Sequence, residues 1–232
     1  MQTARDLMKV VSLDVVRQVP EMEFHIPTPV LAMARFGDWD GILREPSPPA
    51  DLSYTTGLWR YARGLALTAK GQPDEAKKER QKLDEIAATI PPERIIGLNS
   101  ARTLVTIASH VLGGQIDAKQ GRIPEAVRQF EEAVTLQDGL RYYEPPDWYY
   151  PVRESLGALL LHAGRAGEAE RVFREDLKRT PENPWSLRGL AEALRAQRSD
   201  RETASVEERL RRASSKSDVD FSGARSQAFL AR

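Results

Sequence analysis

The sequence predicts an all-α fold, a solenoid of about four to five helix pairs that stack on one another. Turn-forming glycines recur along the chain, and the first two of them, Gly37 and Gly71, lie 34 residues apart. Between the turns, apolar residues follow the 3.6-residue period of an amphipathic helix, and no segment keeps the two-residue alternation of a strand for long. A spacing of 34 residues is typical of repeats in which a helix, a turn and a second helix form one unit.

The composition of the 232 residues is that of an ordinary globular protein, with 41% hydrophobic and 29% charged residues. The 34 basic and 34 acidic residues balance, which argues against nucleic acid or an acidic membrane as the main partner. No cysteine is present, so disulfides, iron–sulfur clusters and thiol catalysis are excluded. The longest uncharged apolar run, residues 103–116, is shorter than the ~20 residues of a membrane-spanning helix. We expect a cytoplasmic protein, although removal of an export signal from a longer precursor stays open.

The expected helices follow the chain in order. The first spans residues 3–19, where valines and leucines form a broad apolar stripe at helical spacing. The others cover residues 27–36, 39–43, 52–70, 73–88, 99–120, 124–137, 150–163, 167–180, 183–197 and 201–213. Proline-rich segments separate some of the pairs as rigid turns, at residues 46–49, 90–92 and 144–147. We expect one solenoid domain over residues 1–213 and a polar C-terminal cap or tail over residues 214–232.

Residues at fixed offsets from the turn glycines support a repeat. Seven residues before the turn the chain has a small residue, and five residues after it an alanine. These positions are Gly64, Gly114, Gly157 and Ala191 before the turn, and Ala76, Ala126 and Ala169 after it. Small side chains let the two helices of a unit approach closely. Nine residues after the turn, Phe130 and Phe173 are expected to fill the gap toward the next unit, whereas an earlier unit has Arg80 there.

With these features the chain resembles the tetratricopeptide repeat (TPR) family. The resemblance is strongest from Tyr150 to Pro181, where Leu156-Gly157, Glu168-Ala169 and Phe173 match the repeat pattern. Over residues 20 to 200 the chain is also similar to the C-terminal half of a group of long bacterial TPR-containing proteins without an agreed activity. The resemblance implies a right-handed α–α superhelix whose first helices line a concave groove. It implies an architecture more than a function.

Motifs that require catalysis or a metal are missing from the sequence. The three histidines, His25, His110 and His162, are too far apart to form the paired ligands of a helical metal site. No phosphate-binding glycine loop and no nucleophile elbow occurs. We therefore expect no enzyme activity, no catalytic residue, no metal and no cofactor. The alternative is a fragment of a metal- or small-molecule-dependent enzyme, whose groove site would combine His25, Glu144, Asp147 and Arg153.

The segment from Tyr142 to Glu154 is the most unusual, with five aromatic residues, three acids, three prolines and one arginine. In one interpretation it is a recognition lip, in which Trp148, Tyr149 and Arg153 are partly exposed beside the groove. In the other it is a loop packed over the core between repeats, with its aromatic side chains buried. The sequence leaves both interpretations open.

The repeat geometry also predicts which residues contact a partner. The first helix of each unit lines the groove, and its mixed charges favour a peptide or a folded protein domain as the ligand. The predicted groove and loop residues are Tyr61, Gln115, Lys119, Trp148, Tyr149, Arg153, Glu154, Trp185, Arg188, Glu192 and Arg195. We therefore expect a protein–protein interaction scaffold with a protein or peptide ligand, and neither nucleic acid nor a membrane as a partner.

The first expected helix, residues 3–19, leaves part of its apolar stripe uncovered, because it has the character of the second helix of an incomplete unit. Each unit of a solenoid buries its apolar face only against its neighbours. We therefore expect self-association or another partner at this end, with Val10, Val11 and Val15 near the contact.

Overall fold

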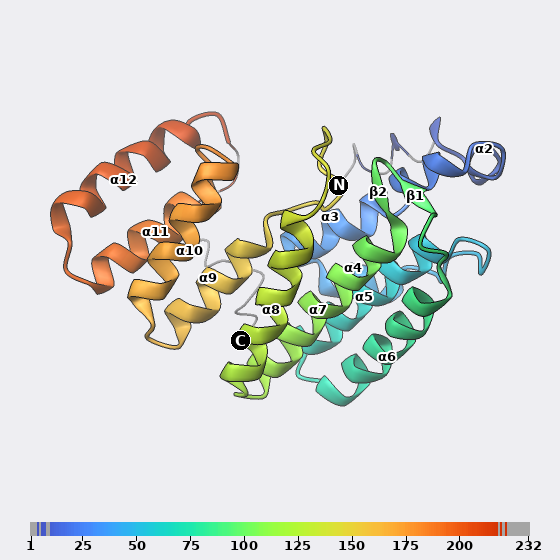
Figure 1. The fold of residues 1–232 in the computed structure, drawn as a ribbon, viewed down its shortest axis with the longest axis horizontal. Coiled ribbons are helices and arrows are strands. Elements are labelled where there is room, and N and C mark those ends of the chain that lie inside the picture. The colour runs from blue at the N-terminus through green and yellow to red at the C-terminus, as the bar shows by residue number, and fades with distance from the viewer. Residues whose placement is uncertain (1–3, 5, 8–9, 218, 220, 222–232) are drawn as a thin grey trace. The chain divides into compact units, whose positions relative to one another are not determined.

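The computed structural model describes residues 4, 6, 7, 10–217, 219 and 221. These residues form eleven α-helices, one 3₁₀ helix and one small antiparallel hairpin (Figure 1). The predicted all-α class is confirmed. The chain forms two compact units, one of residues 1–149 and one of residues 150–231.

Unit 1 contains seven α-helices, the 3₁₀ helix and the hairpin among its described residues. In chain order they are α2 (Leu13–Gln18), η1 (Pro20–His25), α3 (Thr28–Phe36), α4 (Trp39–Arg44), α5 (Ser53–Ala69), α6 (Pro73–Thr89), β1 (Ile95–Ile96), β2 (Asn99–Ser100), α7 (Ala101–Lys119) and α8 (Ile123–Asp138). Each helix packs against the next from α3 to α8, and α5 also contacts α3 and α7 (Figure 1). Helices α5 and α7 therefore lie at the centre of this unit.

The expected first helix, residues 3–19, is broken at Val11 and Ser12, so that part of the prediction is wrong. The physical reason is a cap. The Ser12 side chain accepts a hydrogen bond from the amide of Val15 and starts the separate helix α2, because a serine hydroxyl at an N-cap competes with helix continuation. Val11 is thereby turned inward and packs with Val16 and Leu52.

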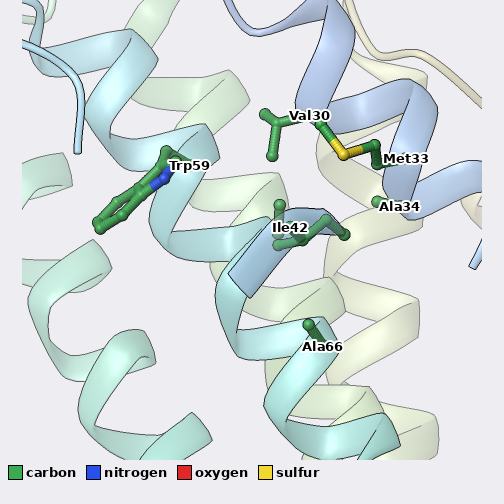
Figure 2. Packing of buried hydrophobic residues seen from close by; sticks show 7 residues of the cluster. Val30, Met33, Ala34, Ile42, Trp59 and Ala66 are labelled. Carbon is green, nitrogen blue, oxygen red and sulfur yellow. The ribbon is translucent and has the colours of Figure 1, made fainter. Parts of the chain in front are cut away.

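The core at the start of unit 1 joins three helices. Val30, Met33 and Ala34 come from α3, Ile42 from α4, and Trp59 and Ala66 from α5, as Figure 2 shows. Asp38 accepts a hydrogen bond from the amide of Gly41 at 2.9 Å and caps α4, so α4 begins directly after the Gly37 turn.

Unit 2 contains four α-helices among its described residues. They are α9 (Val152–His162), α10 (Ala166–Arg179), α11 (Pro184–Ala196) and α12 (Asp200–Ala213). Consecutive helices pack against each other, and α9 also contacts α11. Unit 2 thus repeats the relation that α5 and α7 have in unit 1.

The turns between paired helices share one backbone conformation. The four glycines that start the repeat prediction have φ angles of 74° or 75°, which an L-residue with a side chain adopts only at a cost. They are Gly37, Gly71, Gly121 and Gly164. The next step of 34 residues reaches Arg198, which adopts the same conformation with a φ of 60° between α11 and α12. The repeat therefore continues through a turn that lacks the glycine.

Close helix packing follows the predicted offsets. A Cβ atom at Gly114 would lie 2.5 Å from the ring of Phe130, so only a glycine admits that ring. Phe173 fills two such places, because Cβ atoms at Gly157 and Gly189 would lie 2.5 Å and 2.2 Å from it. These contacts between glycine and phenylalanine join α8 to α7 in unit 1. In unit 2 they join α10 to both α9 and α11.

Candidate functional site

Three of the predicted contact residues form an aromatic cluster in unit 1. The rings of Tyr61 and Trp148 lie 5.6 Å apart, those of Trp148 and Tyr149 lie 5.4 Å apart, and the hydroxyls of Tyr61 and Tyr149 are 3.0 Å apart. Tyr61 is 0% exposed and Trp148 is 2% exposed, whereas Tyr149 is partly exposed, as expected. The expected partial exposure of Trp148 is wrong, because its ring packs against α5 and is shielded from solvent. Tyr61 offers no surface to a partner for the same reason.

Asp147 holds the loop before Trp148 in place. Its carboxylate accepts hydrogen bonds from the Asn99 side chain at 2.6 Å and from the Leu98 amide at 3.2 Å, both in the β1–β2 hairpin. Asn99 in turn accepts from the Arg141 amide at 2.7 Å. A Cβ at Gly97 would lie 2.1 Å from the Asp147 carboxylate, so the hairpin turn has to be glycine. These contacts favour a loop packed over the core.

A second buried polar group lies at the start of α5. Glu23 is fully buried, accepts from the Thr55 amide at 2.9 Å and forms an ion pair with Arg94. Burial raises the pKa of the nearby Tyr54 hydroxyl, and the charges of Asp147 and Glu23 raise it further. Tyr54 therefore stays neutral, and the contacts of Glu23 connect η1 to α5 and to the segment before the hairpin.

The residues of the alternative enzyme site do not form a metal centre. Glu144 is exposed and accepts from the Tyr142 hydroxyl, whereas Asp147 is buried under the hairpin. The His25 ring lies edge-on to Phe24, with centroids 5.2 Å apart. Across the part of the chain that the structure describes, no three His, Asp or Glu side chains are placed to hold a metal ion. Arg153 belongs to unit 2.

Arg153 and Glu154 take part in a buried polar cluster of unit 2. The Asn183 side chain donates to Glu154 at 2.9 Å and to Asp176 at 3.0 Å, and the Ser186 hydroxyl donates to Asp176 at 2.6 Å. Burial raises the pKa of Asp176, while the hydrogen bonds from Ser186 and Asn183, and then the Arg153 charge, oppose the rise. Arg153 is 9% exposed, so its expected partial exposure is also wrong.

A stripe along α11 is the part of the predicted groove that faces solvent in unit 2. It consists of Trp185, Arg188, Glu192 and Arg195, which share one helix face at spacings of three and four residues. Arg188 pairs with Glu192 at 2.9 Å, and Arg195 pairs with Glu207 of α12. The first three are partly exposed and Arg195 is exposed.

The ring of Trp185 meets the C-terminal segment. Phe221 lies edge-on to it, with centroids 5.0 Å apart and an interplanar angle of 72°. In unit 1, Gln115 is buried, and Lys119 at the end of α7 is exposed. The rest of the predicted tail, at residues 218, 220 and 222–232, lies outside the described residues.

Several residues of these clusters were not predicted. Asn99 and Asn183 bind Asp147 and Glu154, which are 48 and 29 residues away in the sequence. Asp176 and Ser186 complete the cluster across the turn between α10 and α11, and no periodic pattern identifies them. The Asn183-Pro184 pair at the start of α11 was the one available indication, since asparagine before a proline is typical of a helix N-cap.

The apolar first segment is only partly as predicted. Val10 is 76% exposed and Val15 is also exposed, whereas Val11 is buried beside Val16 and Leu52. The prediction that Val11 contacts a partner is therefore wrong. Association at this end stays a prediction.

No family model, no curated protein and no solved structure matches the chain. In the described part of the chain, every helix is too short or too polar to cross a membrane.

Proposed function

We propose that the chain is a TPR-like repeat protein, with helix pairs arranged as a right-handed superhelix, that binds a protein or peptide partner. One observation carries the proposal. The first helices of successive pairs contact each other in both units, α5 with α7 and α9 with α11, while each also packs on its own second helix. This is the contact pattern of stacked helix–turn–helix repeats, in which the first helices line one face.

The α11 stripe is the proposed binding surface. In a TPR-like arrangement, α11 is the first helix of its pair, so Trp185, Arg188, Glu192 and Arg195 belong to the concave face. Aromatic and arginine side chains are frequent anchors of protein interfaces. A tryptophan buries a large area with two side-chain torsions, and an arginine supplies five hydrogen-bond donors in a planar group. The alternating basic and acidic groups favour a peptide segment that carries both charge signs.

The aromatic cluster of Tyr61, Trp148 and Tyr149 belongs to unit 1, and its residues are not contact residues in the proposal. In unit 2, α11 packs on α9, α10 and α12, which holds the stripe in a preformed shape. A preformed surface loses less entropy when it binds. The proposed role is therefore recognition by a rigid helical scaffold.

A peptide selection tests the proposal. Peptides are selected from a displayed random library on the immobilised chain, and their dissociation constants are measured by fluorescence polarisation. Arg188→Glu combined with Glu192→Arg keeps the ion pair of α11 but reverses its direction. We expect this swap to weaken selected peptides by about 10-fold or more.

A matched swap serves as the control. Glu208→Arg combined with Arg212→Glu reverses another ion pair with the same spacing, on the second helix α12. We expect this control to leave binding unchanged. The proposal is overturned when no peptide is enriched, or when both swaps weaken binding equally.

A further inference from the structure

A cleft of about 320 Å³ lies in unit 1. Its walls come from α6, from the end of α7 and from Arg122 directly before α8, and its lining residues are Lys77, Arg80, Gln81, Asp84, Ile116, Asp117 and Arg122. This volume is at the lower end of the range of small-molecule sites, ~300–1,000 Å³. One wall is apolar at Ile116, and the other lining residues are polar.

The cleft lies beside a position where the repeat departs from its aromatic pattern. Arg80 stands nine residues after Gly71, where Phe130 and Phe173 stand in the later repeats. Its flat guanidinium covers Gly113 of α7, because a Cβ there would lie 2.4 Å from Arg80 Nη1. The arginine therefore replaces the ring in shape while placing a cation at the cleft.

Neutral side chains hold this cation. Arg80 Nε donates to the Ser109 hydroxyl at 3.3 Å, and Nη2 donates to Gln129 Oε1 at 2.8 Å. His110 Nδ1 lies 3.0 Å from the same Gln129 oxygen and donates to it. Two bonds to Ser109 and Gln129 use two of the five donors of the guanidinium. Nη1 keeps N–H groups for a further acceptor.

The charges of the cleft leave one cation and one anion without an ionic partner among the described residues. Lys77 pairs with Asp74 at 3.2 Å, and Arg122 pairs with Asp117. Arg80 and Asp84 form no ion pair there, and the Ser109 hydroxyl connects them by accepting from Arg80 and donating to Asp84. They are four residues apart on α6, which places their Cβ atoms ~5–6 Å from each other.

We propose that this cleft binds a small zwitterion, of which a free α-amino acid is the simplest form. The carboxylate of the ligand lies against the Arg80 guanidinium, whose fork geometry suits a carboxylate. The ammonium group lies against Asp84, and the side chain of the ligand faces Ile116. Both charges of the ligand then meet the two groups of the cleft that have no ionic partner. This site is independent of the proposed peptide surface.

Binding is measured with the standard L-amino acids as probes. Each is added singly to the full chain at about 10 mM in a thermal-shift assay, because a ligand that binds only the folded state stabilises it by RT ln(1 + [L]/Kd). Titration calorimetry then measures the dissociation constant of the amino acid with the largest shift. We expect a concentration-dependent shift for at least one amino acid, and its absence for all of them overturns the proposal.

Two analogues of that amino acid separate the charges. The amine without the carboxylate and the N-acetylated acid each lack one charged end. We expect each to bind about 10-fold more weakly or worse, because each leaves one charge of the cleft unpaired. Equal binding of the amino acid and both analogues overturns the zwitterion assignment.

Two variants locate the site. Arg80→Phe removes the cation and keeps a flat group over Gly113, as Phe130 does over Gly114. Asp84→Asn removes the anion and keeps an acceptor for Ser109. We expect each to weaken binding about 10-fold or more, whereas the control Lys78→Ala, on α6 but outside the cleft, leaves it unchanged. Unchanged binding in both cleft variants overturns the proposal, and peptide binding at α11 stays intact in either case.

Discussion

Phe173 in unit 2 and Arg80 in unit 1 stand at the same position of their repeats and fill it with different chemistry. Phe173 lies against two glycines, one in its own helix pair and one in the next, and gains its stability from buried apolar area. Arg80 lies against Gly113 and depends on hydrogen bonds to Ser109 and Gln129. The comparison shows that a flat cation can occupy this position in place of an aromatic ring.

The largest expected effect is on the aromatic side of the comparison. Phe173→Ala removes a ring that packs against two glycines, Gly157 and Gly189. We therefore expect the free energy of unfolding to fall by ~3–5 kcal/mol. Hydrogen exchange of α9 and α11 peptides measures where the loss falls. Phe130→Ala is the control, since Phe130 meets one glycine, and an equal loss in α9 and α11 from that variant would contradict the assignment.

A loss of similar size is expected in unit 1 from Trp148→Ala. Its ring is 2% exposed and contacts Tyr61 and Tyr149, so truncation leaves a cavity that costs ~3–5 kcal/mol. The melting temperature and the exchange of α5 peptides measure it. A stable variant with weakened peptide binding would restore the interpretation of this loop as a recognition lip.

The glycines that face Phe173 and Arg80 provide the next test. A Cβ added at Gly189 would lie 2.2 Å from the Phe173 ring, which is held on two sides, so we expect Gly189→Ala to cost ~1–3 kcal/mol. Gly113→Ala meets the far end of the Arg80 side chain, which can shift. Chemical denaturation of both variants compares them, and a larger loss for Gly113→Ala would mean that Arg80 is as rigid as the ring.

Arg80→Phe places in unit 1 the ring that the later repeats have at this position. We expect it to change the free energy of unfolding by no more than ~1 kcal/mol. Two hydrogen bonds worth ~1 kcal/mol each are lost, and a buried ring offsets them. Ser109 and Gln129 keep their bonds to Asp84 and His110. Denaturation with urea measures the difference, and a loss of several kcal/mol would show that the polar network itself is required.

The smallest effect concerns the turns. Arg198 has the left-handed conformation that glycines adopt in the earlier repeats, so Arg198→Gly should stabilise unit 2 by ~0.5–1 kcal/mol. Gly164→Ala, at the corresponding turn, should destabilise it by a similar amount. Thermal unfolding of the two variants measures whether each is stabilised or destabilised. A destabilised Arg198→Gly variant would indicate that the arginine side chain contributes more stability than its backbone strain costs.

The sequence predicted most helices closely because their limits are local. Pro73, Gly71 and Gly121 mark helix starts and turns through their own backbone preferences, and the expected helix 73–88 is observed as Pro73–Thr89. The first segment was predicted wrongly because the Ser12 cap outweighs the apolar stripe around it. The short β1–β2 hairpin was missed because two-residue strands carry no periodic pattern.

The candidate contact residues show where prediction from sequence ends. The repeat geometry assigned Tyr61, Gln115 and Glu154, each on a different helix, to the groove. All three are buried. A helix position is exposed or covered according to what packs on it, and the aromatic loop covers Tyr61 from 87 and 88 residues away in the chain, at Trp148 and Tyr149. Burial is a property of the assembled fold.

The sequence by itself determined the all-α class, the order of the helix pairs and their turns, because glycine, proline and apolar spacing act within a few residues. Only the tertiary structure decided that Trp148 and Arg153 are buried, that Asp147 binds the hairpin, and that a charged cleft lies beside Arg80. These outcomes depend on contacts between distant segments, whose free energies no local pattern contains.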